Sequence, residues 1–559
     1  MNIAHLIREQ AIRNPDKAAA IFPSEKKWKN RSYQYQSISF RQLDQDSDHL
    51  ARQLQKHDIR QGSRVLLFIR PSPEFSLTSF ALFKLGAVPV LIDPGMGLKK
   101  LLHAVRQVAP DSLIAVPQVC LIKKFCPGAF GSVKQTISSG ALSLPGIPSL
   151  HRLLQNRPSH DSADPFPIAS CLPATQAAVL FTSGGTGSPK GVEYTHGIFE
   201  TQIRLLKDMF QFTDADKDMP AFPLFSLMTQ AMGVCSVIPP MNPAKPARAN
   251  PAKLVQVILD QGVTTAAGSP AIWQNVGRYC IREGLRLPSL RALMMFGAPV
   301  SGDILHDFSV IMPTGDTWTP YGATECLPVS CIRGQERLEE QKTSEKPAMG
   351  VCVGFPVMNT RVRIIQPSDT VFQDISQTQE QKTGETGEII VQGAQVTPSY
   401  VTHPEASRDS KIPDSNGGPW HRMGDLGFFD TTGRLWFCGR KAHRVCLTDG
   451  TWLDSVPGEA AFNQHPDIRR SALIPYRSGK QTSAALVIER KDQKTYLPRS
   501  ERQRFRKELS DIAATTEATR KISAFYLSGP FPTDTRHNIK IDRILLARKC
   551  QENRLRTLS

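Results

Sequence analysis

Residues 64–92 read RVLLFIRPSPEFSLTSFALFKLGAVPVLI, and their alternation of apolar runs decides the fold class. Arg64–Ile69 and Val88–Ile92 have the length and composition of buried strands. Phe75–Leu85, between them, has the apolar spacing of a helix, and the residues DPG at 93–95 stop the second strand. Strands that alternate with helices predict an α/β fold, in which helices cover both faces of a parallel sheet.

The same alternation continues on either side of this stretch. Leu43–His57 predicts an earlier helix, and strands are predicted again at Ala177 and near Leu293. Between them, residues 127–170 are rich in Ser, Pro and Gly, which predicts a loop.

The C-terminal part of the chain differs in pattern and in charge. GEIIVQ at 387–392 and GRLWFCG at 433–439 predict strands of a more antiparallel region. The net charge of the chain is +17, and from Arg440 onward 24 Lys and Arg accompany 13 Asp and Glu. Such a basic lobe suits nucleic acid, an acidic membrane surface, an acidic protein or a polyphosphate substrate, or it is a solvated face. Because no zinc-finger spacing or RNP-like aromatic motif accompanies the charge, we expect no nucleic-acid binding.

The composition indicates a globular protein of more than one domain. The chain has 559 residues, of which 40% are hydrophobic and 21% charged, a profile that argues against disordered, collagen-like or heptad-repeat proteins. No apolar run approaches the roughly 20 residues of a membrane span, and the N-terminus lacks a secretory core. Eleven scattered cysteines without a CxxC pair predict free thiols and no structural metal site. We therefore expect a cytoplasmic protein.

A loop rich in Gly, Ser and Thr follows the apolar run AAVL. Residues 181–191 read FTSGGTGSPKG, in which backbone N–H groups and hydroxyls can surround phosphate oxygens while Lys190 adds a positive charge. The spacing is not that of a Walker A loop, GxxxxGK[ST]. Pro189 precedes Lys190 where that pattern has Gly, and Gly191 follows it where the pattern has Ser or Thr. The alternative is a flexible turn with an exposed lysine.

The order of this string resembles the pattern TSGSTGxPKG of the AMP-forming adenylating superfamily, with Gly185 where Ser is commoner. That superfamily contains acyl-CoA synthetases, luciferases, peptide-synthetase adenylation domains and acyl-AMP ligases. Five further segments resemble its motifs in the same order along the chain. They are Gly297-Ala298-Pro299, Tyr321-Gly322-Ala323-Thr324-Glu325, Gly424-Asp425-Leu426-Gly427, Gly439-Arg440-Lys441 and Arg536–Arg543.

The resemblance implies a role for each matching residue in binding Mg·ATP. The loop residues Thr182, Ser183, Gly184, Gly185, Thr186, Gly187 and Lys190 would hold the phosphates. Gly297, Ala298, Pro299 and Tyr321 would contact adenine, with Gly322 and Ala323 beside them. Thr324 would contact the AMP phosphate, Asp425 the ribose hydroxyls, and Arg440 the ribose or phosphate. Glu325, with Thr182, would bind Mg²⁺, for which a carboxylate is a suitable hard oxygen ligand.

The resemblance also implies that Lys540 is catalytic, reaching the acyl carboxylate and the α-phosphate. Its neighbour is Ile539, where the superfamily has Gly. The competing interpretation is one more lysine in a basic tail. An ammonium group 4 Å from developing negative charge contributes about 4 kcal/mol at an effective dielectric constant near 20.

Strings outside and around the motifs resemble the β-lactone synthetases of bacterial long-chain olefin biosynthesis, for example RPSPEF at 70–75 and WTPYGATECLPV at 318–329. Such enzymes adenylate a 2-alkyl-3-hydroxy fatty acid, whose own hydroxyl then displaces AMP. Ala442 replaces the usual hinge Asp or Lys, and the thiol-route pattern survives only at Val456-Pro457-x-Glu459, which fits an enzyme without an external thiol. The alternatives are a fatty acyl-CoA ligase, a fatty acyl-AMP ligase or a non-catalytic binding protein.

The resemblance implies a two-domain architecture. We expect a large N-terminal domain of layered sheets and helices at residues 1–438 and a small, mobile α+β domain at 439–559, with the site between them. Residues 222–230 are expected to border the acyl pocket or to be plain core. The expected cofactors are ATP and Mg²⁺, and the expected partners are a fatty acid and other enzymes of a hydrocarbon pathway. Any membrane association is expected to be peripheral.

Overall fold

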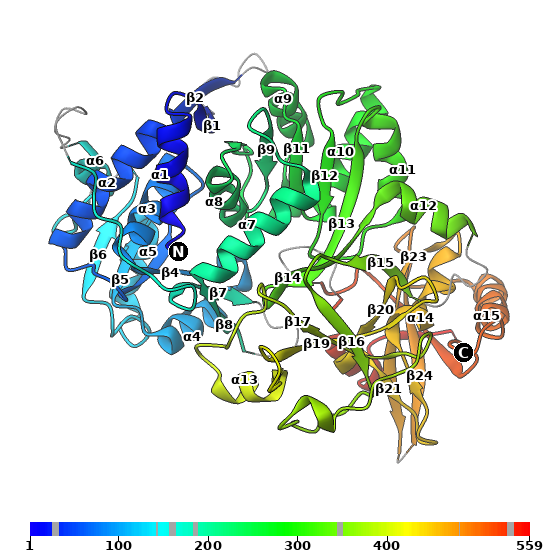
Figure 1. Ribbon diagram of the computed structural model, residues 1–559. Helices are drawn as coiled ribbons and strands as arrows, with labels where there is room; N and C mark the ends of the chain where they lie inside the picture. Colours follow the sequence, from blue (N-terminus) through cyan, green and yellow to red (C-terminus); the bar gives the residue numbers. More distant parts are fainter. Residues whose placement is uncertain are drawn as a thin grey trace. The chain divides into compact units, whose positions relative to one another are not determined.

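The computed structural model describes residues 1–24, 33–140, 144–155, 164–182, 188–343, 350–479, 481–533 and 541–558 (Figure 1). The chain forms two compact units. Unit 1 contains Met1–Trp318, Gly322–Pro328 and Gly393–Arg408, and unit 2 contains Thr319–Tyr321, Val329–Gln392 and Asp409–Ser559. This division differs from the predicted domain boundary at 438/439, which stays a prediction.

The first sheet of unit 1 contains the stretch that predicted the fold. Its strands lie in the order β6-β5-β3-β4-β7-β8, all parallel except β8, which pairs antiparallel with β7. The strands are β3 (Arg64–Phe68), β4 (Val88–Leu91), β5 (Ser112–Ala115), β6 (Gln135–Ser138), β7 (Gln176–Thr182) and β8 (Lys190–Thr195). The predicted alternation of strand, helix and strand at residues 64–92 is confirmed.

A second run of strands lies in the order β13-β12-β11-β9-β10-β1-β2, and all of it except Thr319–Tyr321 of β13 belongs to unit 1. It is parallel from β13 to β1, and β2 closes its edge antiparallel to β1. The strands are β1 (Ala18–Ser24), β2 (Gln34–Ser39), β9 (Lys217–Pro220), β10 (Cys235–Val237), β11 (Thr265–Gly268), β12 (Ala292–Met295) and β13 (Asp316–Ala323). Because the carboxyl ends of parallel strands meet at one edge, the loops that follow β9, β11 and β12 share that edge.

The helices of unit 1 begin and end at residues suited to those positions. Ser39 caps α2 in a reciprocal pair with Gln42, and Gly86 ends α3 with a φ of 67°, where a side chain would be strained. The helices are α1 (Ala4–Arg13), α2 (Phe40–Lys56), α3 (Pro73–Leu85), α4 (Leu98–Val108), α5 (Pro117–Phe125), α6 (Leu150–Gln155), α7 (His196–Phe210), α8 (Pro223–Ala231), α9 (Pro251–Gln261), α10 (Pro270–Glu283) and α11 (Gly302–Ile311).

Unit 2 contains two larger sheets of different character. One is antiparallel where its pairings are given and runs β16-β17-β19-β20-β15-β14, and the other runs β23-β24-β25-β26. The first comprises β14 (Cys326–Arg333), β15 (Val351–Pro356), β16 (Arg361–Ile365), β17 (Gly387–Gln392), β19 (Trp420–Phe429) with β18 (Lys411–Ile412) beside it, and β20 (Leu435–Arg440). The second comprises β23 (Ile468–Ser478), β24 (Gln481–Arg490), β25 (Ile522–Ser528) and β26 (Arg556–Thr557).

The second of these sheets has a core of its own. Val445, Phe462, Leu486 and Phe505 belong to one buried cluster, and every buried member of it lies between Val445 and Leu558. The helices beyond residue 329 are α12 (Gly334–Thr343), α13 (Pro404–Ser410), α14 (Ser455–Ala460), α15 (Arg499–Ala513) and α16 (Arg543–Gln551), and a small ladder joins β21 (Val445–Cys446) to β22 (Trp452–Leu453). The predicted α/β fold with a smaller C-terminal domain is confirmed.

The sequence prediction missed two elements inside residues 127–170. β6 pairs in parallel with β5, and α6 follows it. The strand has only four residues, QTIS, and lies at the edge of its sheet, so it lacks the apolar run that identifies a central strand.

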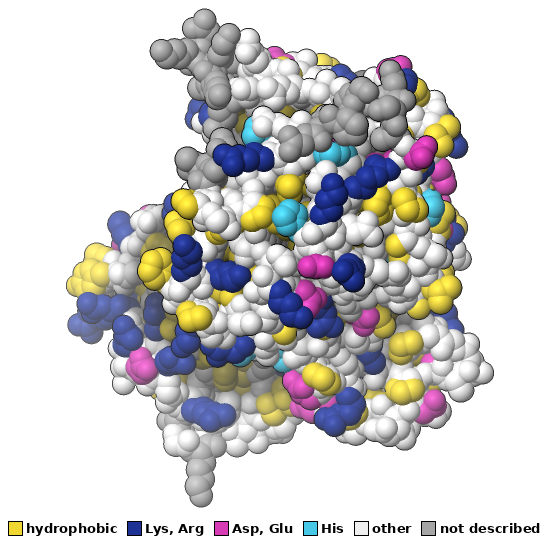
Figure 2. Space-filling model, turned by 90° about the vertical axis from the view of Figure 1, so that its left-hand side faces the viewer, with side chains coloured by type: hydrophobic (Ala, Val, Ile, Leu, Met, Phe, Trp, Pro, Cys, Tyr) yellow, Lys and Arg dark blue, Asp and Glu magenta, His cyan; other side chains and the backbone are white. Residues whose placement is uncertain are grey.

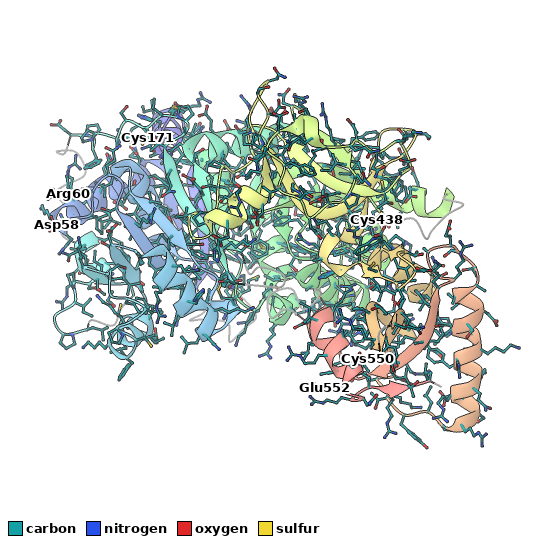
Figure 3. The ribbon with its side chains drawn as sticks, turned by 90° about the horizontal axis from the view of Figure 1, so that it is seen from below. Asp58, Arg60, Cys171, Cys438, Cys550 and Glu552 are labelled. Atoms are coloured by element: carbon teal, nitrogen blue, oxygen red, sulfur yellow. The ribbon has the colours of Figure 1, made fainter. Side chains whose placement is uncertain are left out.

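All eleven cysteines are free thiols, and those labelled in Figure 3 come from separate elements: Cys171 from the segment before β7, Cys438 from β20 and Cys550 from α16. Among the described residues, no helix combines the length and the hydropathy of a membrane span.

Candidate active site

The predicted phosphate loop connects two paired strands. Thr182 ends β7 and Lys190 begins β8, and the two residues are direct partners in the antiparallel ladder. Next to Lys190, a Cβ at Gly191 would lie 3.0 Å from Val179 and 3.1 Å from the Phe181 ring, so a larger residue there would require these side chains to shift. Ser183, Gly184, Gly185, Thr186 and Gly187 lie outside the described residues.

Lys190 and Glu325 both contact the same tyrosine. The Nζ of Lys190 lies 4.8 Å from the centre of the Tyr400 ring, within range of a cation–π interaction. The Tyr400 hydroxyl donates a 2.8 Å hydrogen bond to an oxygen of Glu325. Tyr400 is 7% exposed. These contacts bring a predicted phosphate ligand to the ring, and a predicted Mg²⁺ ligand to the hydroxyl, of one buried tyrosine.

The backbone around Glu325 is fixed from two directions. The buried Tyr194 hydroxyl donates to the Thr324 carbonyl oxygen at 2.7 Å, and burial raises the pKa of Tyr194, which keeps the donor protonated. The backbone N–H of Thr397 donates to the Glu325 carbonyl oxygen at 2.9 Å. Thr324 and Glu325 are therefore held by β8 and by the 393–400 segment, not by their own neighbours alone.

The predicted adenine loop lies at the carboxyl ends of the parallel strands that include β9, β11 and β12. Gly297, Ala298 and Pro299 follow β12, and Gly297 has a φ of 88°, which favours glycine. The residue before them, Phe296, packs on Phe225 with ring centroids 5.0 Å apart and on Phe222 at 5.7 Å. An aromatic cluster thus adjoins this loop and includes two residues of the predicted acyl-pocket segment.

A second group of predicted residues meets in unit 2. Asp425 on β19 is the ladder partner of Arg440 on β20, and its carboxylate accepts from the Tyr321 hydroxyl at 2.7 Å and pairs with Arg440 Nε at 3.0 Å. The Asp425 side chain is 5% exposed. Gly424 and Gly439, which precede the two partners, have φ values of 65° and 121°. Residues 104 positions apart in sequence, Tyr321 and Asp425, are therefore in direct contact.

Lys540 lies outside the described residues, but the chain on both sides of it is described. Thr533 forms an antiparallel bridge with Ile541. After the bridge, Arg543 donates from Nη2 to both oxygens of Glu459 at 2.8 Å, while Glu459 also accepts from the backbone N–H of Leu473. Burial raises the pKa of Glu459, and the Arg543 charge opposes that rise.

Three residues of these groups were not assigned by sequence reasoning. Tyr194, Phe296 and Tyr400 carry no motif signal, because their importance depends on which residues the fold places beside them. Glu459 was noticed only as a remnant of the thiol-route pattern. Its pairing with Arg543 across 84 residues has no signature in the sequence.

The donor set suits a cation that is held mainly by phosphate oxygens. Among the described residues, no three His, Cys, Asp or Glu side chains gather as a metal site. The Glu325 carboxylate and the Thr182 hydroxyl are hard oxygen donors, the kind that Mg²⁺ takes when substrate phosphates and water complete its coordination. These residues fit the predicted Mg²⁺ in that manner.

Comparison with known proteins identifies the family. The AMP-binding enzyme family matches residues 7–401, more than half of the chain. The olefin beta-lactone synthetase of Xanthomonas campestris pv. campestris is 37% identical over 551 residues, covering 98% of this chain and 97% of that protein. The olefin beta-lactone synthetase of Stenotrophomonas maltophilia is 36% identical over 558 residues, with 98% and 97% covered.

A solved structure gives the same result for the fold. The o-succinylbenzoate coenzyme A synthetase of Bacillus subtilis, in complex with ATP and a magnesium ion, aligns with a TM-score of 0.72 at 20% identity, covering 97% of this chain and 98% of that one. The predicted adenylate-forming fold and the predicted class of AMP-forming ligase are confirmed. The chain belongs to the AMP-binding enzyme family.

Proposed function

We propose that this enzyme converts a 2-alkyl-3-hydroxy fatty acid into a β-lactone, at the expense of ATP, in olefin biosynthesis. The observation that carries the proposal is the likeness over 98% of the chain to two proteins named olefin beta-lactone synthetase, at 36% and 37% identity. Two sets of contacts support the first half of the reaction: in unit 1, Lys190 and Glu325 contact the same tyrosine, and in unit 2, Tyr321 contacts Asp425.

The first step forms an acyl adenylate. A carboxylate oxygen of the acid bonds to the α-phosphorus of ATP, and the bond to pyrophosphate breaks. Bound Mg²⁺ would neutralise charge on the transferring phosphates. We assign Glu325 and Thr182 to Mg²⁺, Asp425 to the ribose and Thr324 to the α-phosphate. Lys540 stabilises the charge that develops between the carboxylate and the phosphate.

The other predicted site residues are assigned to the phosphates, the adenine and the ribose of ATP. The phosphate loop binds the β- and γ-phosphates, Gly297–Pro299 with Tyr321 lies against adenine, and Arg440 contacts the ribose or phosphate. These assignments place Thr182–Gly187 and Lys190 in the loop and Gly322 and Ala323 beside adenine. The aromatic cluster of Phe222, Phe225 and Phe296 supports an acyl pocket next to the adenine loop.

The second step closes the lactone. The 3-hydroxyl oxygen of the bound acid bonds to its own acyl carbon, the hydroxyl proton leaves, and AMP departs with the bonding electrons. The product is the acid less one water. Because the second nucleophile is part of the substrate, no thiol is needed.

We also propose that residues 439–559 form the mobile domain. The buried clusters of that region draw their members from residues 445–558, whereas the clusters built on β17, β19 and β20 draw theirs from residues 365–438. This separation of the cores supports a boundary near Gly439. Since that domain carries Lys540, its movement would bring the lysine to the site or withdraw it.

Mass spectrometry of the products tests the function. The enzyme is incubated with ATP, Mg²⁺ and a long-chain 2-alkyl-3-hydroxy acid, with and without coenzyme A, and in parallel with the matched acid that lacks the 3-hydroxyl. We expect a product one water lighter than the hydroxy acid, together with AMP, in the absence of coenzyme A. The matched acid should release pyrophosphate but give no lactone.

The two acids separate the alternatives. A thioester formed only with coenzyme A would indicate an acyl-CoA ligase, and an accumulating acyl adenylate from both acids would indicate an acyl-AMP ligase. Absence of pyrophosphate release from either acid would indicate a binding protein and overturn the proposal.

A further inference from the structure

The topology of the first sheet puts α4 and α5 side by side. The chain passes through α4 from β4 to β5 and through α5 from β5 to β6, moving in one direction along the order β6-β5-β3-β4. Right-handed crossovers in one direction lie on one face of a sheet, whereas α3, which connects β3 to β4 in the opposite direction, lies on the other face. The Arg106 side chain of α4 confirms the closeness, because its Nε donates to the Gly128 carbonyl just after α5 at 3.1 Å.

The inner sides of these helices form a core, and their outer sides carry apolar groups in solvent. Val105 and Cys120 pack in one buried cluster with the sheet. On the outer side of α5, Leu121 is 41% and Phe125 84% exposed, and Leu98, the first residue of α4, is 57% exposed. Among the large hydrophobic side chains described as exposed, Phe125 exposes the greatest fraction. Apolar groups placed in water in this way favour a surface that buries them.

Basic residues are neighbours of the exposed apolar residues in the sequence. Residues 98–134 contain six Lys and Arg and a single acidic residue, Asp111. The Asp111 carboxylate accepts from the backbone N–H of Arg64 at 2.8 Å, at the end of β3, so it is engaged by the sheet. Lys99 and Lys100 follow Leu98, and Lys124 precedes Phe125, and all three lysines are exposed. Figure 2 shows one face of the molecule on which Lys and Arg are more abundant than Asp and Glu and lie among hydrophobic side chains.

We propose that the outer sides of α4 and α5 dock on an anionic lipid bilayer. The α4–α5 surface consists of Leu98, Lys99, Lys100, Leu121, Lys124 and Phe125. Lipid phosphates attract the lysines, and the three apolar side chains enter the boundary between headgroups and hydrocarbon. This inference goes beyond the proposed function and holds whichever acid the enzyme activates.

A bilayer fits the surface better than an acidic protein does. Leu121 and Phe125 are four residues apart on α5, so they are neighbours on one face of that helix, whereas Leu98 lies on α4. Fluid lipid adapts to such protrusions, whereas a folded protein needs a matching pocket for each. The lysine stems can also lie along apolar lipid while their charges stay at the headgroups.

Co-sedimentation of the full-length protein with vesicles tests the proposal. The vesicles contain equal parts of phosphatidylglycerol and phosphatidylcholine, or phosphatidylcholine alone. We expect the protein to sediment with the anionic vesicles and to be released by salt. The variant K99Q/K100Q/K124Q and the variant L121S/F125S should each reduce the bound fraction at least about fivefold, while circular dichroism stays unchanged because the altered side chains are exposed.

Matched variants elsewhere serve as controls. R502Q/R504Q/R506Q removes three cations from α15, and I12S/I281S removes two exposed apolar side chains from α1 and α10. Both should bind vesicles like the wild type. Equal loss in these controls, no binding of the wild type to anionic vesicles, or complete competition by polyglutamate would overturn the proposal, the last in favour of an acidic protein.

Discussion

The hydroxyl of Tyr400 donates a 2.8 Å hydrogen bond to the carboxylate of Glu325, and the same tyrosine ring lies 4.8 Å from Lys190 Nζ. A residue outside every recognised motif thus links two residues from different motifs. Its position makes Tyr400 a positioning residue for Glu325, the proposed Mg²⁺ ligand.

Replacing Tyr400 with Phe separates these two contacts. The variant keeps the ring near Lys190 and loses only the hydrogen bond to Glu325. A hydrogen bond to a charged group contributes about 1.5–3 kcal/mol, so we expect ATP–pyrophosphate exchange to slow about tenfold or more, with an altered dependence on Mg²⁺. Tyr35→Phe is the matched control, because Tyr35 donates in the same way to Asp260, at 2.6 Å. Equal exchange rates for wild type and Tyr400→Phe would contradict the assigned role.

Asp425 is expected to act together with Tyr321. One oxygen of its carboxylate accepts from the Tyr321 hydroxyl and the other pairs with Arg440, so these two residues orient the carboxylate that we assign to the ribose. Asp425→Asn should raise the KM for ATP about tenfold or more, and Tyr321→Phe should raise it less. Because the two residues are in contact, the double variant should lose less than the sum of the two single losses. Strictly additive effects on KM in that cycle would show that the two residues act separately.

The fold was more predictable than the contacts of the site. Residues 64–92 predicted a parallel sheet because strand and helix have different apolar periods, which are local properties. The contact of Tyr321 with Asp425 depends on strands that meet only in the folded chain. Tyr400 follows no period or motif, and its role follows from the bridge between Val192 on β8 and Tyr400 itself. The order of the motifs along the sequence identified the motif residues, whereas the residues that contact and position them were identified only from the fold.

Lys540→Ala should abolish pyrophosphate release that depends on the acid while leaving the fold intact. The ammonium contribution of about 4 kcal/mol corresponds to a loss of roughly three orders of magnitude in rate. Lys549→Ala, on α16 of the same basic region, is the matched control and should keep its activity. Near-normal pyrophosphate release by Lys540→Ala would remove this lysine from the mechanism.

The buried carboxyl group of Asp218 is expected to make the stability of the protein depend on pH. Burial raises its pKa from 3.8 to about 7, although Thr265 donates a 2.7 Å hydrogen bond to it. Between these two values the folded state keeps a proton that the unfolded state has released, so stability falls as the pH rises from about 4 to about 7. Asp218→Asn keeps an acceptor for Thr265 and carries no charge, so its urea midpoint should fall less over that range. If the urea midpoints of the wild type and of Asp218→Asn fell equally with pH, ionisation of Asp218 would not lower the stability of the protein.

The pair of Glu459 and Arg543 is expected to set the position of Lys540. Arg543 follows Lys540 by three residues, and its two 2.8 Å hydrogen bonds to the buried Glu459 attach this part of the chain to α14. Glu459→Gln keeps the shape of the side chain but loses the charge, so we expect a lower kcat for adenylation with an unchanged KM for ATP. Glu459→Ala leaves the Arg543 charge without its partner and should also destabilise the protein, by about 3–5 kcal/mol.

A double-variant cycle distinguishes positioning from mere loss of stability. If Glu459 acts through Lys540, Glu459→Gln should not reduce the residual rate of Lys540→Ala any further. Asp216→Asn is the control, because Asp216 pairs with Arg291 at 2.8 Å in unit 1, and its replacement should lower stability without changing kcat. A further loss of rate when Glu459→Gln is added to Lys540→Ala would mean that Glu459 contributes to adenylation by a route that does not pass through the lysine.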